Sequence, residues 1–298
     1  MTTVLVAGVA VIDFVFRVEE MPRRAEKYRA LGAEIVGGGG AANAAVAIAR
    51  LGGAAMLATR LGDDAVADLI VAELLRERVD CSLVRRLDGK RSSFSSVFVD
   101  RAGERQIVNF RDMGMSFDAD WVTAMLPDRF DAALADTRWP QGGPAVLKAA
   151  RRRGLPAVVD AEAPIHEAME TLMAGTHIAF SRQGLRDFAG DEDVERGLRQ
   201  AAEATGAWVC VTDGEHGVTY LADDTVAHVP AFRVNAIDTL AAGDVWHGAF
   251  ALALGERQAE IEAIRFANAV AAIKCTRFGG RAGVPDRGEA EAFMRANA

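Results

Sequence analysis

The chain has 298 residues, of which 50% are hydrophobic and 26% are charged. This composition supports a sizeable core and excludes an intrinsically disordered protein, and a formal net charge of -8 argues against nucleic acid or an anionic membrane surface as a partner. Three scattered cysteines, no basic signal-peptide start and no stretch of about 20 apolar residues lead us to expect a cytoplasmic protein without disulfides, zinc-binding cysteines or membrane spans.

The first third of the chain predicts one buried strand followed by strands with a polar face. Val4–Val9 is a continuous apolar run, which is typical of a strand buried on both sides. Partly alternating patterns follow, the clearest at Ser93–Val99 and Gln106–Phe110, where an intervening Asp-Arg-Ala-Gly sequence indicates a hairpin turn. We expect these strands to form a small antiparallel lid from segments near 13–36 and 91–113.

The rest of the chain alternates between strand and helix patterns. The predicted strands are Ala55–Arg60, Asp131–Asp136, Pro156–Asp160, His177–Phe180 and Trp208–Thr212, and then a hairpin of Gly217–Leu221 and Thr225–His228 around Ala222-Asp223-Asp224. The predicted helices are Ala42–Leu51, Ala65–Arg78, Pro144–Arg153, Glu167–Met173, Val194–Thr205, Gly243–Leu254, Ile261–Arg277 and Glu289–Ala296.

This alternation predicts right-handed crossovers, and hence an α/β fold with a mostly parallel central sheet and helices on both of its faces. Since no linker divides the chain, we expect one domain over residues 1–298, with the lid inserted in its first third. Ligands of such sheets bind beyond the carboxyl ends of the strands.

The segment Asp238-Thr239-Leu240-Ala241-Ala242-Gly243-Asp244, which precedes a helical pattern, carries the strongest chemical signal. Small residues before a helix leave the free N–H groups at its start open to a ligand, and those groups together with the helix dipole favour an anion. Asp244 falls in the first turn of that helix. A carboxylate there either simply complements the dipole or accepts a proton beside a transferring phosphoryl group.

A second signal is the glycine run Gly37-Gly38-Gly39-Gly40, with Asn43 on the helix that follows it. Four glycines allow the backbone to lie directly against a ligand, and an asparagine side chain at that place can hydrogen-bond hydroxyl groups. The other interpretation is a flexible hinge between the lid and the body.

In this order, the two segments resemble the ribokinase/PfkB family of carbohydrate kinases, which has a glycine-rich segment near its N-terminus and a C-terminal DTxGAGD motif. The resemblance extends over essentially the whole chain, and it includes Asp13, the VTxGxxG string Val211–Gly217 and Asn268. It implies a ribokinase-like fold, ATP and Mg²⁺ as cofactors, and transfer of a phosphoryl group to a sugar hydroxyl.

The resemblance also implies roles for individual residues. Asp244 would be the catalytic base, and the anion hole beside it would be formed by Ala241, Ala242 and Gly243. The positions that hold sugar hydroxyls would be Asp13, Gly38, Gly39 and Asn43. The positions along ATP would be Thr212, Gly214, Gly217 and Asn268, the last of them near the adenine.

Ala241 departs from the motif, which has glycine there; alanine suits this loop at negative φ and is strained at positive φ. Some members of the family bind K⁺ beside the anion hole, and by resemblance that site would use Asp238 and carbonyl groups near Arg277 and Gly279. Because Gly283 stands where a serine sometimes contributes, we expect the K⁺ site to be weakened or absent. The five histidines lack ligand spacing, so we expect no metal site built from side chains.

Lys27, Asn109 and Arg138 indicate a substrate with an anionic group. Arg138 follows a buried strand, where a cation can point into the ligand crevice, and Lys27 and Asn109 lie on lid segments. Each of them could be a solvated polar group, but together they fit the three acceptor oxygens of a tetrahedral anion on the sugar. The cluster does not separate a sulfonate from a phosphate.

The strings Glu26–Tyr28, Ala135–Trp139 and Lys274–Asp286 are similar to the branch of this family that phosphorylates the 1-hydroxyl of 6-deoxy-6-sulfofructose in sulfoquinovose degradation. We therefore expect that activity, with the three polar residues above on the sulfonate. The alternatives are a kinase for another ketose, such as fructose or a phosphorylated hexulose, and a sugar-binding regulator without catalysis. The exposed edge of the lid leads us to expect a homodimer formed through it.

Overall fold

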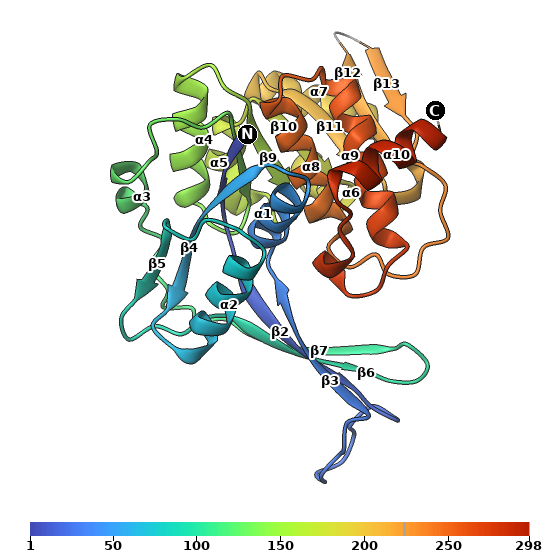
Figure 1. Cartoon of the computed structure of the whole chain (residues 1–298). Coiled ribbons are helices and arrows are strands. Elements are labelled where there is room, and N and C mark those ends of the chain that lie inside the picture. Colours follow the sequence, from blue (N-terminus) through green and yellow to red (C-terminus); the bar gives the residue numbers. More distant parts are fainter. Residues whose placement is uncertain (223–224, 298) are drawn as a thin grey trace.

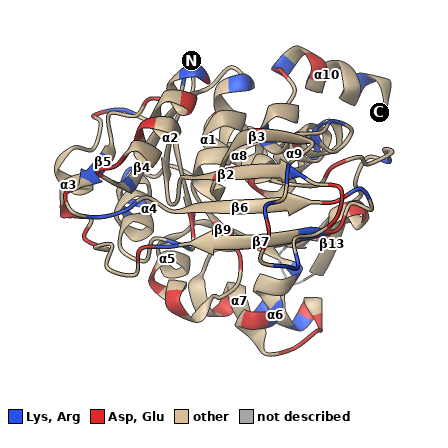
Figure 2. Ribbon diagram, turned by 90° about the horizontal axis from the view of Figure 1, so that it is seen from below, with Lys and Arg blue, Asp and Glu red and all other residues tan. Residues whose placement is uncertain are grey.

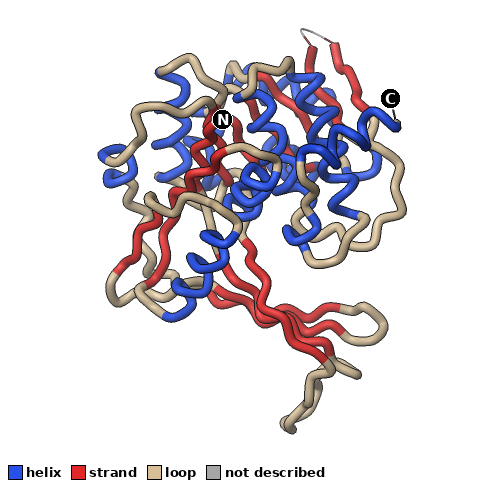
Figure 3. Tube along the Cα trace, viewed as in Figure 1, coloured by secondary structure: helices blue, strands red, loops and turns tan. Residues whose placement is uncertain are grey.

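The structure is a computed structural model that describes residues 1–222 and 225–297. A large body contains a nine-stranded sheet between two layers of helices, and a separate four-stranded sheet projects from one end of it (Figure 1). The tube in Figure 3 shows the second sheet and its loops standing clear of the body. The turn residues Asp223 and Asp224 of the predicted hairpin lie outside the described residues.

The strand order of the large sheet is β13-β12-β11-β10-β9-β8-β1-β4-β5. Its strands are β1 (Thr3–Ala7), β4 (Ala54–Gly62), β5 (Val84–Leu87), β8 (Ala132–Asp136), β9 (Ala157–Ala161), β10 (His177–Ser181), β11 (Trp208–Thr212), β12 (Val218–Ala222) and β13 (Thr225–Val229). Every pairing from β5 across to β11 is parallel, and the two pairings at the other edge are antiparallel. The predicted mostly parallel sheet is confirmed.

The helices are α1 (Gly40–Arg50), α2 (Ala65–Arg76), α3 (Asp120–Ala124), α4 (Gly142–Arg152), α5 (Met169–Ala174), α6 (Arg182–Ala189), α7 (Val194–Thr205), α8 (Ala242–Gly255), α9 (Glu260–Cys275) and α10 (Arg287–Ala296). They cover both faces of the sheet, as alternate residues of β1 show. Val4 and Val6 pack into a core with α1, α8 and α9. Leu5 and Ala7 pack into a second core with α4 to α7. No described helix is long and apolar enough to cross a membrane.

Three elements of the body carry no strong sequence pattern and were missing from the prediction. β5 is a four-residue edge strand with two exposed arginines, and α3 is only five residues long. α6 is short and polar, with Gly184 and Leu185 as its buried residues. The predicted helix Glu167–Met173 is in fact a 3-10 turn, His166–Ala168, that continues into α5.

The second sheet is the predicted lid, and its strand order is β3-β2-β6-β7. The strands are β2 (Val11–Arg17), β3 (Gly32–Gly38), β6 (Phe94–Val99) and β7 (Arg105–Phe110), which lie side by side in Figure 2. The prediction that this layer is antiparallel is wrong at its centre, where β2 and β6 pair in parallel. The hairpins β2–β3 and β6–β7 both extend from the body. Their first strands, β2 and β6, lie next to each other at the centre of the sheet.

Asp136, the last residue of β8, joins three segments of the body. Its carboxylate accepts hydrogen bonds from the backbone N–H groups of Val9 (2.9 Å), Ala41 (3.1 Å) and Arg138 (2.9 Å). These groups belong to the β1–β2 crossing, the first turn of α1 and the chain after β8. Burial, partly opposed by these hydrogen bonds, raises the pKa of Asp136 to about 6.

Replacing Asp136 with alanine is expected to lower the free energy of unfolding by about 3 kcal/mol or more, because each buried N–H group left without an acceptor costs roughly 1–3 kcal/mol. The raised pKa means that the charged form is disfavoured in the folded state. The stability that Asp136 contributes therefore falls as the pH rises from its unfolded value of 3.8 towards about 6. Urea denaturation at several pH values measures both effects.

The matched control is Asp131→Ala, because the Asp131 carboxylate accepts a single backbone hydrogen bond, from Thr3 at 2.7 Å. Equal destabilisation by the two variants would contradict the joining role of Asp136.

Candidate active site between the lid and the body

Asp244 lies in the first turn of α8, directly beside α1. The Asn43 side-chain amide donates to Asp244 Oδ2 at 2.7 Å, so the two predicted site residues meet although they are 201 positions apart in the chain. Gly248 makes this approach possible, because a Cβ there would lie 2.6 Å from Ala44 O in α1. In the glycine run, a Cβ on Gly39 would lie 2.4 Å from Val9 O, so that glycine lets the backbone before α1 pass close to the β1–β2 crossing.

The start of α8 presents backbone donors next to Asp244. The N–H group of Ala242 donates to Thr239 O at 3.1 Å, so it is already used. Within the described chain, the N–H groups of Gly243 and Asp244 have no acceptor, and the space around Gly243 is open. These two groups, more than Ala242, are available to an anion at the positive end of the helix dipole.

Ala241 precedes α8 in the left-handed conformation, with φ 62° and ψ 13°. An alanine Cβ is disfavoured there by about 1–2 kcal/mol, and the favourable case of negative φ does not apply. The surrounding contacts thus impose the shape that glycine adopts freely in the motif. The turn is strained at Ala241, but it keeps the left-handed conformation that a glycine would adopt there.

Two buried groups to which the sequence interpretation gave no role stand behind Asp244. Asp160, on β9, is buried, which raises its pKa; the charge of His247 opposes this shift and that of Asp244 adds to it. The His247 ring lies 2.7 Å from Gly243 O and 3.5 Å from Asp160 Oδ1. His247 therefore ties the first turn of α8 to the end of β9. No described cluster of three or more acidic, histidine or cysteine side chains could hold a metal ion.

One row of polar side chains crosses the lid sheet. In the register of β2, β6 and β7, Asp13 lies opposite Ser95, which lies opposite Asn109, so the three side chains share a face. Asn109 donates to Ser95 Oγ at 3.2 Å, and burial raises the pKa of Asp13 while its hydrogen bond with Ser95 lowers it. Gly38 adjoins the row, since a Cβ there would lie 3.1 Å from Asp13 Oδ2.

Arg281 is a third residue to which the sequence interpretation gave no role. It is 3% exposed, its Nη1 lies 3.4 Å from Asn43 Oδ1, and its Nη2 lies 2.9 Å from Glu73. A Cβ on Gly37 would collide with its guanidinium. It lies in the string Lys274–Asp286, which supports a resemblance to one branch of the family but indicates no role for Arg281 itself. Arg281 therefore orients the amide of Asn43, which in turn donates to Asp244.

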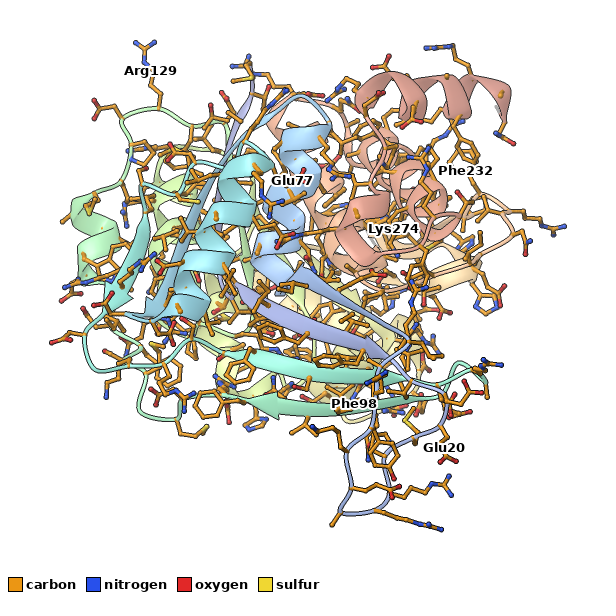
Figure 4. The ribbon with its side chains drawn as sticks, turned by 60° about the horizontal axis from the view of Figure 1, so that its bottom comes forward. Glu20, Glu77, Phe98, Arg129, Phe232 and Lys274 are labelled. Atoms are coloured by element: carbon orange, nitrogen blue, oxygen red, sulfur yellow. The ribbon has the colours of Figure 1, made fainter. Side chains whose placement is uncertain are left out.

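The three residues expected to hold an anion do not meet within one chain. Arg138 follows β8, and its guanidinium donates to Ala163 O at 2.8 Å and lies 3.6 Å from Glu162. Lys27 is exposed in the loop that joins β2 to β3, beyond the pair Arg17–Gly32. Figure 4 labels Glu20 in this loop, which projects from the far end of the lid. Along the strand, Lys27 is thus separated from Asp13 by more than about 13 Å.

The residues expected along ATP lie at the carboxyl end of β11 and beside it. Thr212 ends that strand, and Gly214 and Gly217 both have positive φ. A Cβ on Gly217 would lie 2.3 Å from Val229 O, so this glycine lets two segments approach closely. Asn268 is already engaged: it accepts from Trp246 Nε1 at 2.8 Å and donates to Pro230 O at 3.1 Å.

Asp238, the first residue of the motif, is held by a buried ammonium group. Lys274 Nζ donates to Asp238 O at 2.7 Å and lies 3.8 Å from its Oδ2, with the lysine side chain 0% exposed. The carboxylate also accepts from the backbone N–H groups of Leu240, Gly279 and Gly280. Figure 4 labels Lys274 within the body. These donors already surround Asp238, so a K⁺ ion does not fit this donor set.

A family model described as "pfkB family carbohydrate kinase" matches residues 1–287 of the chain. The chain is 26% identical over 297 residues to a ribokinase from Bacillus subtilis (strain 168), covering 99% of this chain and 100% of that protein. A crystal structure from Agrobacterium tumefaciens, described as that of a candidate ribokinase, has a TM-score of 0.88 and 37% identity, with 99% of this chain and 98% of that one covered.

An Arabidopsis thaliana ribokinase complexed with ribose and ATP has the same fold, with a TM-score of 0.85 and 23% identity over 99% of this chain and 98% of that chain. The family match spans nearly all of the sequence, and its glycine segment and DTxGAGD-like turn meet at one place in the fold. The chain belongs to the pfkB family of carbohydrate kinases.

Proposed function

We propose that the protein transfers the γ-phosphoryl group of ATP to the 1-hydroxyl of an anionic ketose, and that this ketose is 6-deoxy-6-sulfofructose. The observation that carries the kinase activity is the carboxylate of Asp244, fixed by Asn43 beside two N–H groups that have no acceptor in the described chain. A base and an anion-binding helix start at one point are what phosphoryl transfer to a hydroxyl requires.

In the reaction, Asp244 accepts the proton of the sugar hydroxyl as its oxygen attacks the γ-phosphorus. The bond from that phosphorus to the bridging oxygen breaks, and ADP leaves with the electron pair. The N–H groups of Gly243 and Asp244 hold the charge on the transferring oxygens, while Asn43 keeps the carboxylate in place. Mg²⁺ would arrive with ATP and neutralise part of the triphosphate charge.

ATP as the donor is supported by the ribokinase relative that was solved with ATP. We place it over the carboxyl ends of β10 and β11, along Thr212, Gly214 and Gly217. Asn268 lies beside this place and donates a hydrogen bond to Pro230 O. We therefore assign it a supporting role in the wall of the adenine pocket, without a direct contact to the adenine.

The sugar would lie under the lid, with hydroxyls on Asp13, Gly38, Gly39 and Asn43. Asn109 continues the same row toward the anionic group, and Arg138 follows a neighbouring strand. Lys27 reaches such a site only from a second copy of the chain, because its loop projects away from its own body. We therefore propose a dimer in which the lids pair and exchange these loops.

The resemblance of Lys274–Asp286 to the sulfofructose branch favours a sulfonated sugar. A kinase for fructose or a phosphorylated hexulose is the alternative, since a cation cluster accepts either anion. An inactive sugar-binding regulator is the third candidate, and the intact pair of Asp244 and Asn43 argues against it.

Replacing Asp244 with asparagine should lower kcat by about 10²–10⁴-fold and leave sugar and ATP binding nearly unchanged, because only the proton acceptor is removed. Turnover is measured by coupled ADP release, and binding by calorimetry. Asp120→Asn is the matched control, since Asp120 occupies the first turn of α3 away from the site. Turnover of the Asp244 variant within about tenfold of the wild type would refute the base.

Replacing Arg138 with alanine should raise KM for 6-deoxy-6-sulfofructose by about 10- to 100-fold and spare fructose, because a charge-assisted hydrogen bond contributes roughly 1.5–3 kcal/mol. The wild type and the variant are assayed with 6-deoxy-6-sulfofructose, fructose and fructose 6-phosphate. Arg129→Ala serves as the control, because Figure 4 shows Arg129 at the far end of the body. Equal losses for neutral and anionic sugars would show that Arg138 only supports the fold.

Turnover should not change when K⁺ is replaced by choline, since the Lys274 ammonium already holds Asp238. Lys274→Ala should lower turnover, and added KCl should restore part of it by placing a cation beside the freed oxygens. Activation of the wild type by K⁺ would contradict this account. Steady-state rates at constant ionic strength provide the measurement.

A further inference from the structure

His247 is a buried histidine near the start of α8, and both nitrogens of its ring face acceptors. Nδ1 lies 2.7 Å from Gly243 O. Nε2 lies 3.2 Å from Ala179 O, on β10, and 3.5 Å from Asp160 Oδ1, on β9. Because the residue is only 3% exposed, bulk water does not compete for either nitrogen. The contacts of the ring therefore decide its protonation state.

The two carbonyl groups beside the ring require two N–H donors. A carbonyl oxygen can only accept a hydrogen bond, and a neutral imidazole has a single N–H group. A neutral His247 would therefore turn a nitrogen lone pair toward either Gly243 O or Ala179 O. The imidazolium form satisfies both carbonyl groups, and Asp160 beside Nε2 supplies the counter-charge.

The carboxyl groups of three segments favour a cation at this place. Burial raises the pKa of Asp160, and the charge of His247 opposes that shift. Further carboxyl groups act on Asp160 and also raise its pKa, and these are Asp244 on α8, Glu162 after β9 and Asp136 on β8. A positive charge on His247 offsets the repulsion among these groups, directly behind the proposed base.

The contact with Gly243 O reaches the start of α8 through one peptide unit. The carbonyl group of Gly243 and the N–H group of Asp244 belong to the same peptide unit, because the two residues are adjacent. A donor on the oxygen of a peptide unit polarises the unit and makes its N–H group a stronger donor. The Asp244 N–H group has no acceptor in the described chain, so an anion at the helix start receives this stronger hydrogen bond.

We propose that His247 is held as an imidazolium and is a positioning residue of the anion hole, because its hydrogen bond to Gly243 O strengthens the Asp244 N–H group toward the transferring phosphoryl group. This inference rests on the proposed function and adds a residue to it. The phosphoryl group in transfer meets these N–H groups more closely than bound ATP does. The effect therefore falls on kcat and leaves KM for the sugar and for ATP nearly unchanged.

Two variants separate the bond to Gly243 O from the rest of the side chain. In His247→Asn, the amide takes the place of Nδ1 and can still donate to Gly243 O. In His247→Gln, the longer amide takes the place of Nε2 and cannot. We expect kcat to fall about tenfold or more in His247→Gln and only about threefold in His247→Asn. Equal losses in the two variants, a smaller loss in His247→Gln, or a loss confined to KM would overturn the proposal.

The matched controls are the same two substitutions at His177. This histidine is also largely buried, but it begins β10 and thus lies at the amino end of the strand, away from α8's first turn. We expect both His177 variants to keep kcat within about twofold of the wild type. Urea denaturation verifies that all four variants are folded under the assay conditions. A His177 pair that reproduces the His247 pattern would reject the proposal.

The protonation state is measured on the wild type, without any substrate. In protein that carries nitrogen-15-labelled histidine, a long-range proton–nitrogen correlation spectrum distinguishes an imidazolium from either neutral tautomer. At about pH 7.5, above the ordinary pKa of histidine, we expect His247 to be an imidazolium. His177 should be neutral in the same spectrum, because burial lowers its pKa, partly opposed by Glu260. A neutral His247 rejects the proposal.

The resonance of the Asp244 amide nitrogen measures the polarisation itself, because it responds to a donor on the Gly243 oxygen. It should shift in His247→Gln and stay near its wild-type position in His247→Asn, and a resonance that neither variant moves would contradict the proposal. These spectra also separate this inference from the proposed function. If the wild type phosphorylates no sugar while both spectra behave as expected, the proposed function fails and the imidazolium on Gly243 O is supported.

Discussion

The Asp136 carboxylate fixes the geometry on which the site depends, because it is the common acceptor for the β1–β2 crossing, the start of α1 and the chain after β8. A buried carboxylate is costly unless its oxygens are hydrogen-bonded, and here three backbone donors offset part of that cost. Through α1 the same interaction sets Asn43, and Asn43 sets Asp244. The carboxylate that we propose as the catalytic base is thus held in place by contacts that lead back to the centre of the large sheet.

The glycines of this structure matter mainly because they have no side chain, which lets neighbouring groups come close to the backbone. Gly37 makes room for the Arg281 guanidinium, Gly39 for the backbone at Val9, and Gly248 for the backbone of α1. Each position brings polar groups closer than a Cβ would allow. Ala241 differs from these positions, because it carries a side chain in the left-handed region, as Arg78 and Arg257 also do, and its neighbours hold it there at a conformational cost.

The main sheet and its helices could be predicted because their signals are local: apolar runs for buried strands and helical periodicity for the covering helices. The meeting of the glycine segment with the DTxGAGD-like turn was implied by the resemblance to the family, and not by a local pattern. β5, α3 and α6 escaped because short or exposed elements bury too little to leave a pattern. The parallel pairing of β2 with β6 depends on how two distant hairpins leave the body, which no local pattern records.

The side chains around the site show the same division. Asp244 and Asn43 belong to recognisable strings, whereas Asp160, His247 and Arg281 matter through contacts between distant segments. The sequence resemblance assigns Lys27 and Arg138 to one anion site, but within one chain the length of the lid separates the two residues.

The lid also contacts the segment Asp238–Asp244, to which we assign phosphoryl binding. Arg105, on β7, lies 4.0 Å from Asp238, and Arg17, on β2, lies 5.1 Å from the centre of the Phe278 ring. Asp238 begins the segment that leads into α8, so in the proposed reaction the sheet that covers the sugar contacts the turn that holds the phosphoryl group. Under that proposal, a sugar that seats the lid also positions this turn, whereas water cannot hold the lid down and is a poor acceptor of the phosphoryl group.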